Sequence, residues 1–196
     1  MDRKERLNAR DLINVGIYTA LYFVIQFILA MTGFIPAMMV VMVPVNAFIG
    51  GIVLMLYYTR VKKFGMATLT GTLIGILVFL MGRPFLSLII CILSGLFADL
   101  AMKRGGYKTV SSRPVAAGLQ SLWNVGMSLA MYFGYREGYM ASLVEGYGQE
   151  YVDTVSRLMP DWTFFALIPV IFLFGFLGGR FGAKLLKKHF ERAGIA

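Results

Sequence analysis

Cysteine and histidine are almost absent from this sequence, and their scarcity removes several kinds of catalytic site. The chain has 196 residues, with one cysteine, Cys91, and one histidine, His189. A single cysteine cannot form an internal disulfide, and one histidine beside it cannot make up a zinc-binding set. His189 lies in a basic tail, away from any serine in an apolar stretch, which argues against a Ser–His protease. No GxxxxGK[ST] phosphate loop is present, which excludes ATP hydrolysis by that route.

Acidic residues are scarce as well. Ten Asp and Glu stand against nineteen Lys and Arg, which gives a formal net charge of +9 at pH 7. No two carboxylates are placed to meet within an apolar stretch, which argues against metal catalysis and against a proton relay. We therefore expect a protein that is not an enzyme and has no cofactor and no bound metal.

Apolar residues, by contrast, make up 58% of the chain. They gather in six stretches of about 17–24 residues, each long enough for a helix to cross the hydrocarbon layer of a bilayer. The stretches are 11–31, 36–59, 64–80, 84–102, 113–133 and 162–185. The chain is too short for a second domain. We expect an all-α membrane protein, with six transmembrane helices in one bundle and a single domain over residues 1–196.

Positive charge marks one side of this bundle. Sixteen of the nineteen basic residues fall before residue 11, in the gaps 60–63 and 103–113, or in the end segment 180–192. With six spans these segments share one face, which the positive-inside rule makes cytoplasmic. Topology therefore explains the net charge, and we expect no nucleic-acid partner. We expect a multi-pass protein of the cell membrane with both termini in the cytoplasm.

The gap at 134–161 is the one long loop, and this topology places it outside. Apolar residues at helical spacing, such as Leu143 with Tyr147 and Tyr151 with Val155, predict two short amphipathic helices. We expect the break between them near Gly146 or Gly148. Loops of this length are often functional, so the segment is either a lid or a simple cover over the outer end.

Amide side chains lie inside two of the apolar stretches. Asn46 falls near the middle of the second, while Gln120, Asn124 and Ser128 in the fifth are spaced to share one helical face, with Trp123 beside it. Amides beside an indole suit a planar polar ligand, and they suit hydrogen bonds between helices equally well.

Two further charged positions need a reason. Arg83 is the basic residue of a short outer turn, and it either snorkels to the lipid headgroups or serves as a donor fork for an anionic or carbonyl-bearing ligand. Asp99 and Lys103 stand four residues apart near the inner end of the fourth stretch, where we expect an ion pair.

Small residues recur at a spacing of four. GxxxG pairs in 71–75 and 175–182 predict close helix packing. Gly16 and Ala20 share a face of the first helix, which is either packed within the bundle or free to dock against another membrane protein.

Several of these features together resemble the substrate-binding (S) component of an energy-coupling factor (ECF) transporter. The resemblance rests on the six spans, on the outer loop and on Gly16-x-x-x-Ala20, which is a glycine variant of an AxxxA motif. The chain resembles the Trep_Strep group of membrane proteins over nearly its whole length. The segments that carry this are DLINVGIYTALYF at 11–23, VKKFGM at 61–66, GLFADL at 95–100 and LKKHFERAGIA at 186–196.

The resemblance implies partners and a ligand site. Gly16 and Ala20 would dock onto a transmembrane coupling protein, which works with two cytoplasmic ATPases, in an importer for a small vitamin-like or base-like micronutrient. The implied substrate-binding candidates are Phe34, Asn46, Arg83, Gln120, Trp123, Asn124, Tyr132 and Trp162. A stand-alone small membrane carrier is the alternative, and a membrane enzyme is a weaker one.

Overall fold

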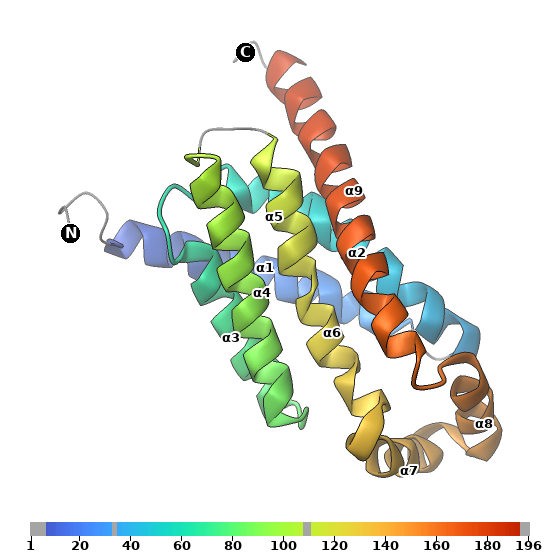
Figure 1. Cartoon of the computed structure of the whole chain (residues 1–196). Coiled ribbons are helices and arrows are strands. Elements are labelled where there is room, and N and C mark those ends of the chain that lie inside the picture. The colour runs from blue at the N-terminus through green and yellow to red at the C-terminus, as the bar shows by residue number, and fades with distance from the viewer. Residues whose placement is uncertain (1–6, 33–34, 108–110, 193–196) are drawn as a thin grey trace.

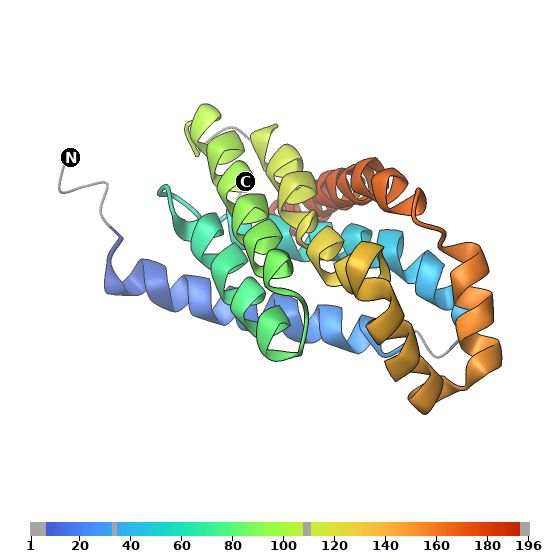
Figure 2. The same cartoon turned by 60° about the horizontal axis from the view of Figure 1, so that its bottom comes forward.

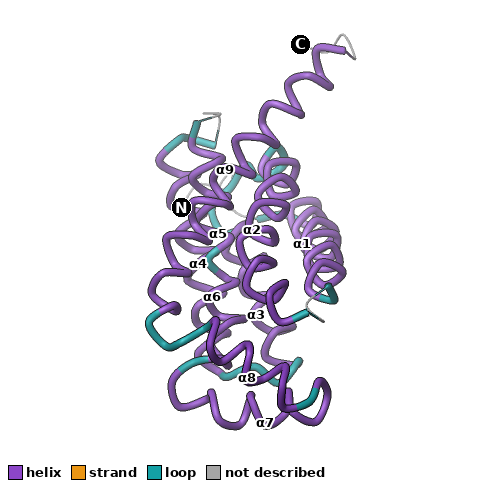
Figure 3. Tube along the Cα trace, turned by 90° about the vertical axis from the view of Figure 1, so that its right-hand side faces the viewer, coloured by secondary structure: helices purple, strands orange, loops and turns teal. Residues whose placement is uncertain are grey.

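The computed structural model describes residues 7–32, 35–107 and 111–192, and no strand occurs among them. The elements are α1 (Ala9–Ala30), α2 (Pro36–Tyr58), α3 (Met66–Leu80), α4 (Phe85–Arg104), α5 (Ser112–Ser121), α6 (Trp123–Ser128), η1 (Leu129–Met131), η2 (Phe133–Tyr135), α7 (Arg136–Tyr147), α8 (Gln149–Leu158) and α9 (Thr163–Arg192). The long helices form one bundle, and α7 and α8 lie together across one end of it (Figure 1). The C-terminal end of α9 lies at the opposite end (Figures 1 and 3).

Four helices are long and apolar enough to cross a membrane. These are α1, α2, α4 and the part of α9 from Thr163 to Lys188. The third expected span is the shorter, 15-residue α3, and the fifth is divided into α5, α6 and η1. Large apolar side chains such as Ile13, Ile17 and Phe165 are exposed on the outside of the bundle, as suits a surface in contact with lipid. The all-helical prediction is confirmed, while six spans and cytoplasmic termini stay predictions.

A local sequence signal explains where the first helix begins, and the second helix contains a proline. Asn8 caps α1: its side chain accepts from the backbone N–H of Asp11 at 3.0 Å, and the Asp11 carboxylate accepts from the N–H of Asn8 at 2.9 Å. This reciprocal pair is a capping box, which fixes the start of the helix. Pro44 lies inside α2, which continues past it as one helix to Tyr58.

Glycines bring the helices into close contact. A Cβ atom added to Gly178 would overlap the carbonyl oxygen of Phe48, so α9 lies directly against the backbone of α2. In the same way, a Cβ on Gly71 of α3 would overlap the carbonyl oxygen of Cys91 of α4. These contacts confirm the packing role expected of the GxxxG pairs.

The predicted ion pair between Asp99 and Lys103 is wrong. The fully buried Asp99 carboxylate accepts from the backbone N–H groups of Gly65, Ala67 and Thr68 at 3.0, 3.3 and 2.7 Å, and from the Thr68 hydroxyl at 2.6 Å. It therefore caps the start of α3, where the N–H groups have no partner within their own helix. The Lys103 ammonium lies instead over the ring of Phe64, 5.3 Å from its centroid.

Candidate functional site

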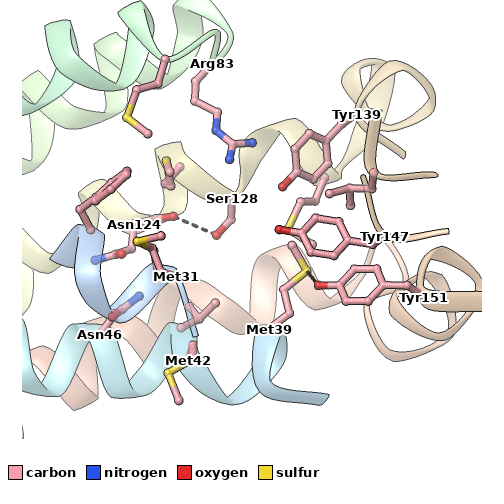
Figure 4. Close-up of a pocket in the computed structure, with 17 residues that line it drawn as sticks. Met31, Met39, Met42, Asn46, Arg83, Asn124, Ser128, Tyr139, Tyr147 and Tyr151 are labelled. Carbon is pink, nitrogen blue, oxygen red and sulfur yellow. Dashed lines mark hydrogen bonds between the residues drawn. The ribbon is translucent and has the colours of Figure 1, made fainter. Parts of the chain in front are cut away.

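A cavity of about 380 Å³ lies at the end of the bundle that α7 and α8 cover. Its walls come from the last turns of α1, the first half of α2, the turn between α3 and α4, and the segment from α6 to η1 (Figure 4). Figure 2 shows the chain passing from α6 into α7 and α8 at this end of the bundle. The helices α7 and α8 line its remaining side, and they meet at Gly148, one of the two glycines at which the sequence predicted the break. A pocket of this size suits a small molecule.

Amide and hydroxyl groups line the inner part of the cavity. Asn46 reaches it from α2, and its buried side-chain oxygen has no hydrogen-bond partner among the described residues. Asn124 and Ser128 reach it from α6, where the Asn124 amide donates to the carbonyl of Ser121 at 3.0 Å and the Ser128 hydroxyl donates to the carbonyl of Asn124 at 2.9 Å. Asn46 thus brings a polar atom without a described partner close to the cavity.

Three tyrosines form the wall on the side of α7 and α8: Tyr139, Tyr147 and Tyr151. Their hydroxyl groups point toward the cavity (Figure 4). The rings of Tyr147 and Tyr151 stack with centroids 4.7 Å apart, and the Tyr151 hydroxyl donates to the Met39 sulfur at 3.5 Å. Burial, together with the neighbouring tyrosines, raises the pKa of Tyr151, so its hydroxyl stays neutral and can donate a hydrogen bond at physiological pH.

Arg83 carries the one ionised group among the described residues that line the cavity. Its half-buried side chain extends from the turn between α3 and α4 toward Tyr139, with Cζ 4.8 Å from the centroid of that ring. This position contrasts with the snorkelling alternative, because the guanidinium points into the protein (Figure 4).

Methionines cover much of the remaining wall, and sequence reasoning missed them. Six of the thirteen in the chain line the cavity: Met31, Met39, Met42, Met81, Met127 and Met131. Thioether side chains are flexible and polarisable, and they pack well against aromatic rings. The signal in the sequence was their concentration near the outer ends of the expected spans.

The structure brings together three of the eight predicted binding residues. Asn46, Arg83 and Asn124 line the cavity, and Phe34 lies outside the described residues. The other four, Gln120, Trp123, Tyr132 and Trp162, do not line it.

These four residues have other surroundings. Gln120 is fully buried in the bundle, with no partner for its amide among the described residues. The Trp123 indole donates to the Tyr22 hydroxyl at 2.7 Å. Tyr132 shares a hydrogen bond with the Thr163 hydroxyl at 3.0 Å, and Trp162 is 68% exposed. Leu122 separates α5 from α6, and of the three residues expected on one face only Asn124 and Ser128, both in α6, reach the cavity.

Arg136 fastens α7 and α8 to the bundle. Its guanidinium donates to the carbonyls of Met131 and Met159 at 3.2 and 2.9 Å, and to the Asp161 carboxylate at 3.1 Å. These acceptors belong to the segments before α7 and after α8. One side chain therefore joins both ends of the α7–α8 segment, which we call the lid (residues 136–158).

The small-residue pair on α1 lies on the outside of the bundle. Gly16 and Ala20 are both exposed, and a Cβ atom added to Gly16 would have no described atom within 4 Å, apart from its own helix. Packing within the described bundle therefore does not account for the pair. For metals, no group of three His, Cys, Asp or Glu side chains in the described part of the chain could hold an ion.

Taken together, the apolar exposed helices and the lidded cavity define a helical integral membrane protein. The chain belongs to the family described as "hypothetical bacterial integral membrane protein (Trep_Strep)", whose model matches residues 9–192. No curated protein and no solved structure matches it.

Proposed function

We propose that this chain is the substrate-binding component of an energy-coupling factor importer in the bacterial cell membrane. In this proposal the lidded cavity binds a small vitamin-like or base-like micronutrient at the outer side. A transmembrane coupling protein and two cytoplasmic ATPases complete the importer, so ATP is hydrolysed by these partners and the chain itself is not an enzyme.

The observation that carries the proposal is the exposed pair of small residues on α1, Gly16 and Ala20. Glycines such as Gly51, Gly71 and Gly178 each face the backbone of a neighbouring helix, so packing explains them. Gly16 and Ala20 are also small and share a helix face, but both are exposed, and in the described part of the chain Gly16 has no such neighbour. A small-residue face that is free on the outside lets a helix of a second membrane protein approach closely.

The positions of the cavity and of this face on α1 support the same proposal. Phe27 and Met31, near the end of α1, line the cavity, while Gly16 lies about 16 Å earlier along the helix axis. Ligand and coupling protein would then contact different parts of one helix. Such an arrangement lets a subunit hold its ligand and its partner together.

The test is assembly of the chain with its coupling protein and ATPases in membranes, measured by co-purification. Gly16→Leu should reduce the recovered complex at least about tenfold, because the leucine side chain blocks close helix approach. The variant should still fold, since the site has space and leucine favours a helix more than glycine does. Gly138→Leu is the matched control, because Gly138 is an exposed helical glycine of α7 with equally free space.

Full recovery of the complex with Gly16→Leu would contradict docking through α1. Ligand uptake by vesicles that contain the purified chain alone, without ATPases, would instead support a stand-alone carrier.

A further inference from the structure

We infer that the cavity takes a small aromatic carboxylate and that Arg83 binds its carboxylate group. This inference rests on the proposed function, because it names the ligand class of the same cavity. Three observations support it: the Arg83 guanidinium has no acceptor among the described residues, it carries the one charge of the described lining, and methionine and tyrosine side chains form the walls.

The N–H donors of the Arg83 guanidinium have no hydrogen-bond acceptor among the described residues. In the described part of the chain it makes no hydrogen bond and no ion pair, and it lies over the face of the Tyr139 ring. The acidic residues of the lid, such as Glu137 and Glu145, lie on its exposed side and do not line the cavity. A guanidinium has five N–H donors in a rigid fork that matches a carboxylate, so a ligand can supply the missing acceptors.

The charge of the lining sets the charge of the ligand. Arg83 is the one ionised group among the described lining residues, so a ligand group with a single negative charge neutralises it. A phosphate monoester carries about −1.5 to −2 near pH 7, and the excess would be buried among thioethers and aromatic rings at a cost. A carboxylate fits this balance, and a phosphate does not.

The walls set the shape of the rest of the ligand. Methionine side chains and the tyrosine rings provide a soft apolar surface that favours a flat aromatic body through sulfur–ring and ring–ring contacts. The Asn46 amide adds a polar group to the lining that can bind a polar edge of the ring system, and its buried side-chain oxygen has no partner among the described residues. The volume of about 380 Å³ limits the ligand to a small molecule.

The test uses the purified full chain in phosphatidylcholine nanodiscs and matched pairs of acid and amide. The probes are nicotinate with nicotinamide, 4-aminobenzoate with 4-aminobenzamide, and indole-3-acetate with indole-3-acetamide, with affinity measured by titration calorimetry. At least one acid should bind at least about tenfold more tightly than its amide. Arg83→Gln should remove this preference, because it weakens binding of the acid more than binding of the amide.

Two variants and a second lipid sharpen the result. Arg83→Lys should keep only part of the preference, because an ammonium lacks the bidentate fork. Arg157→Gln removes the same charge from the exposed side of α8 and should leave the preference intact. Acid binding should also persist in nanodiscs that contain phosphatidylglycerol. Its loss there would identify a lipid headgroup as the anion and overturn the inference.

The inference is also overturned if the wild-type chain prefers none of the acids, or if Arg83→Gln retains the preference. Because the titration uses the isolated chain, failed docking through Gly16 would not affect it. Equally, a chain that binds neutral ligands could still assemble with the coupling protein, so the two proposals fail separately.

Discussion

At the residue scale, Asp99 shows how a buried charge in a membrane bundle finds its partners. The spacing of four residues predicts an ion pair with Lys103. Instead, the Asp99 carboxylate accepts four hydrogen bonds, all from groups at the start of α3. The first N–H groups of a helix have no partner within that helix and carry partial positive charge, so a carboxylate there is stabilised by hydrogen bonds and by the helix dipole.

Replacing Asp99 by Ala should destabilise the protein by roughly 2–4 kcal/mol, because several buried N–H groups lose their acceptor. Asp99→Asn should cost less, since the amide oxygen can still accept. Thermal unfolding in detergent measures both. Lys103→Ala is the control and should cost under about 1 kcal/mol. An equal loss of stability in Lys103→Ala and Asp99→Ala would instead support the ion pair.

At the element scale, buried apolar side chains such as Leu143 and Val155 pack the lid onto the bundle, and Arg136 joins its two ends. Arg136 joins the segments on both sides of α7 and α8 through three acceptors, whereas these helices are short and Gly148 separates them at φ 85°. Short helices of this kind are marginally stable without tertiary contacts. The lid should therefore open locally when these bonds are lost.

Arg136→Ala should raise the hydrogen-exchange rate of backbone amides in residues 136–158 by about tenfold or more, with little change in α4. Arg157→Ala is the control, because Arg157 is exposed on the same lid. Unchanged exchange with Arg136→Ala would show that the lid is held by other contacts.

The elements differ in how far their sequence predicts them. The lid helices were predictable because apolar residues repeat at helical spacing and glycine marks the break. The division of the fifth span at Leu122 was not, since no proline or glycine stands there. Gln120 was expected to line the same site as Asn124, and it does not line the cavity. Trp123 was expected at the ligand, but its partner Tyr22 is 101 residues away in the sequence.

At the scale of the whole molecule, the sequence indicated a helical membrane protein and the end at which a ligand could bind. Asn46, Arg83 and Asn124 were predicted from their expected depth in the membrane and from the side of it on which they should lie. The fold brings all three to one cavity. The concentration of methionines near the outer ends of the expected spans did not identify the cavity walls by itself, because a methionine at such a position is equally compatible with a contact with lipid. Only the three-dimensional arrangement of α1, α2 and α6 turns these side chains toward one space.

Sidedness underlies the whole account, because an importer must present its cavity to the outside. The most direct measurement is labelling of intact cells with a membrane-impermeant thiol reagent, using Gly138→Cys in the lid and Lys62→Cys between α2 and α3. The native Cys91 is fully buried and should stay unlabelled. We predict that Gly138→Cys is labelled in intact cells, and that Lys62→Cys is labelled only after the membrane is permeabilised. Labelling of Lys62→Cys from outside, with Gly138→Cys protected, would contradict the account.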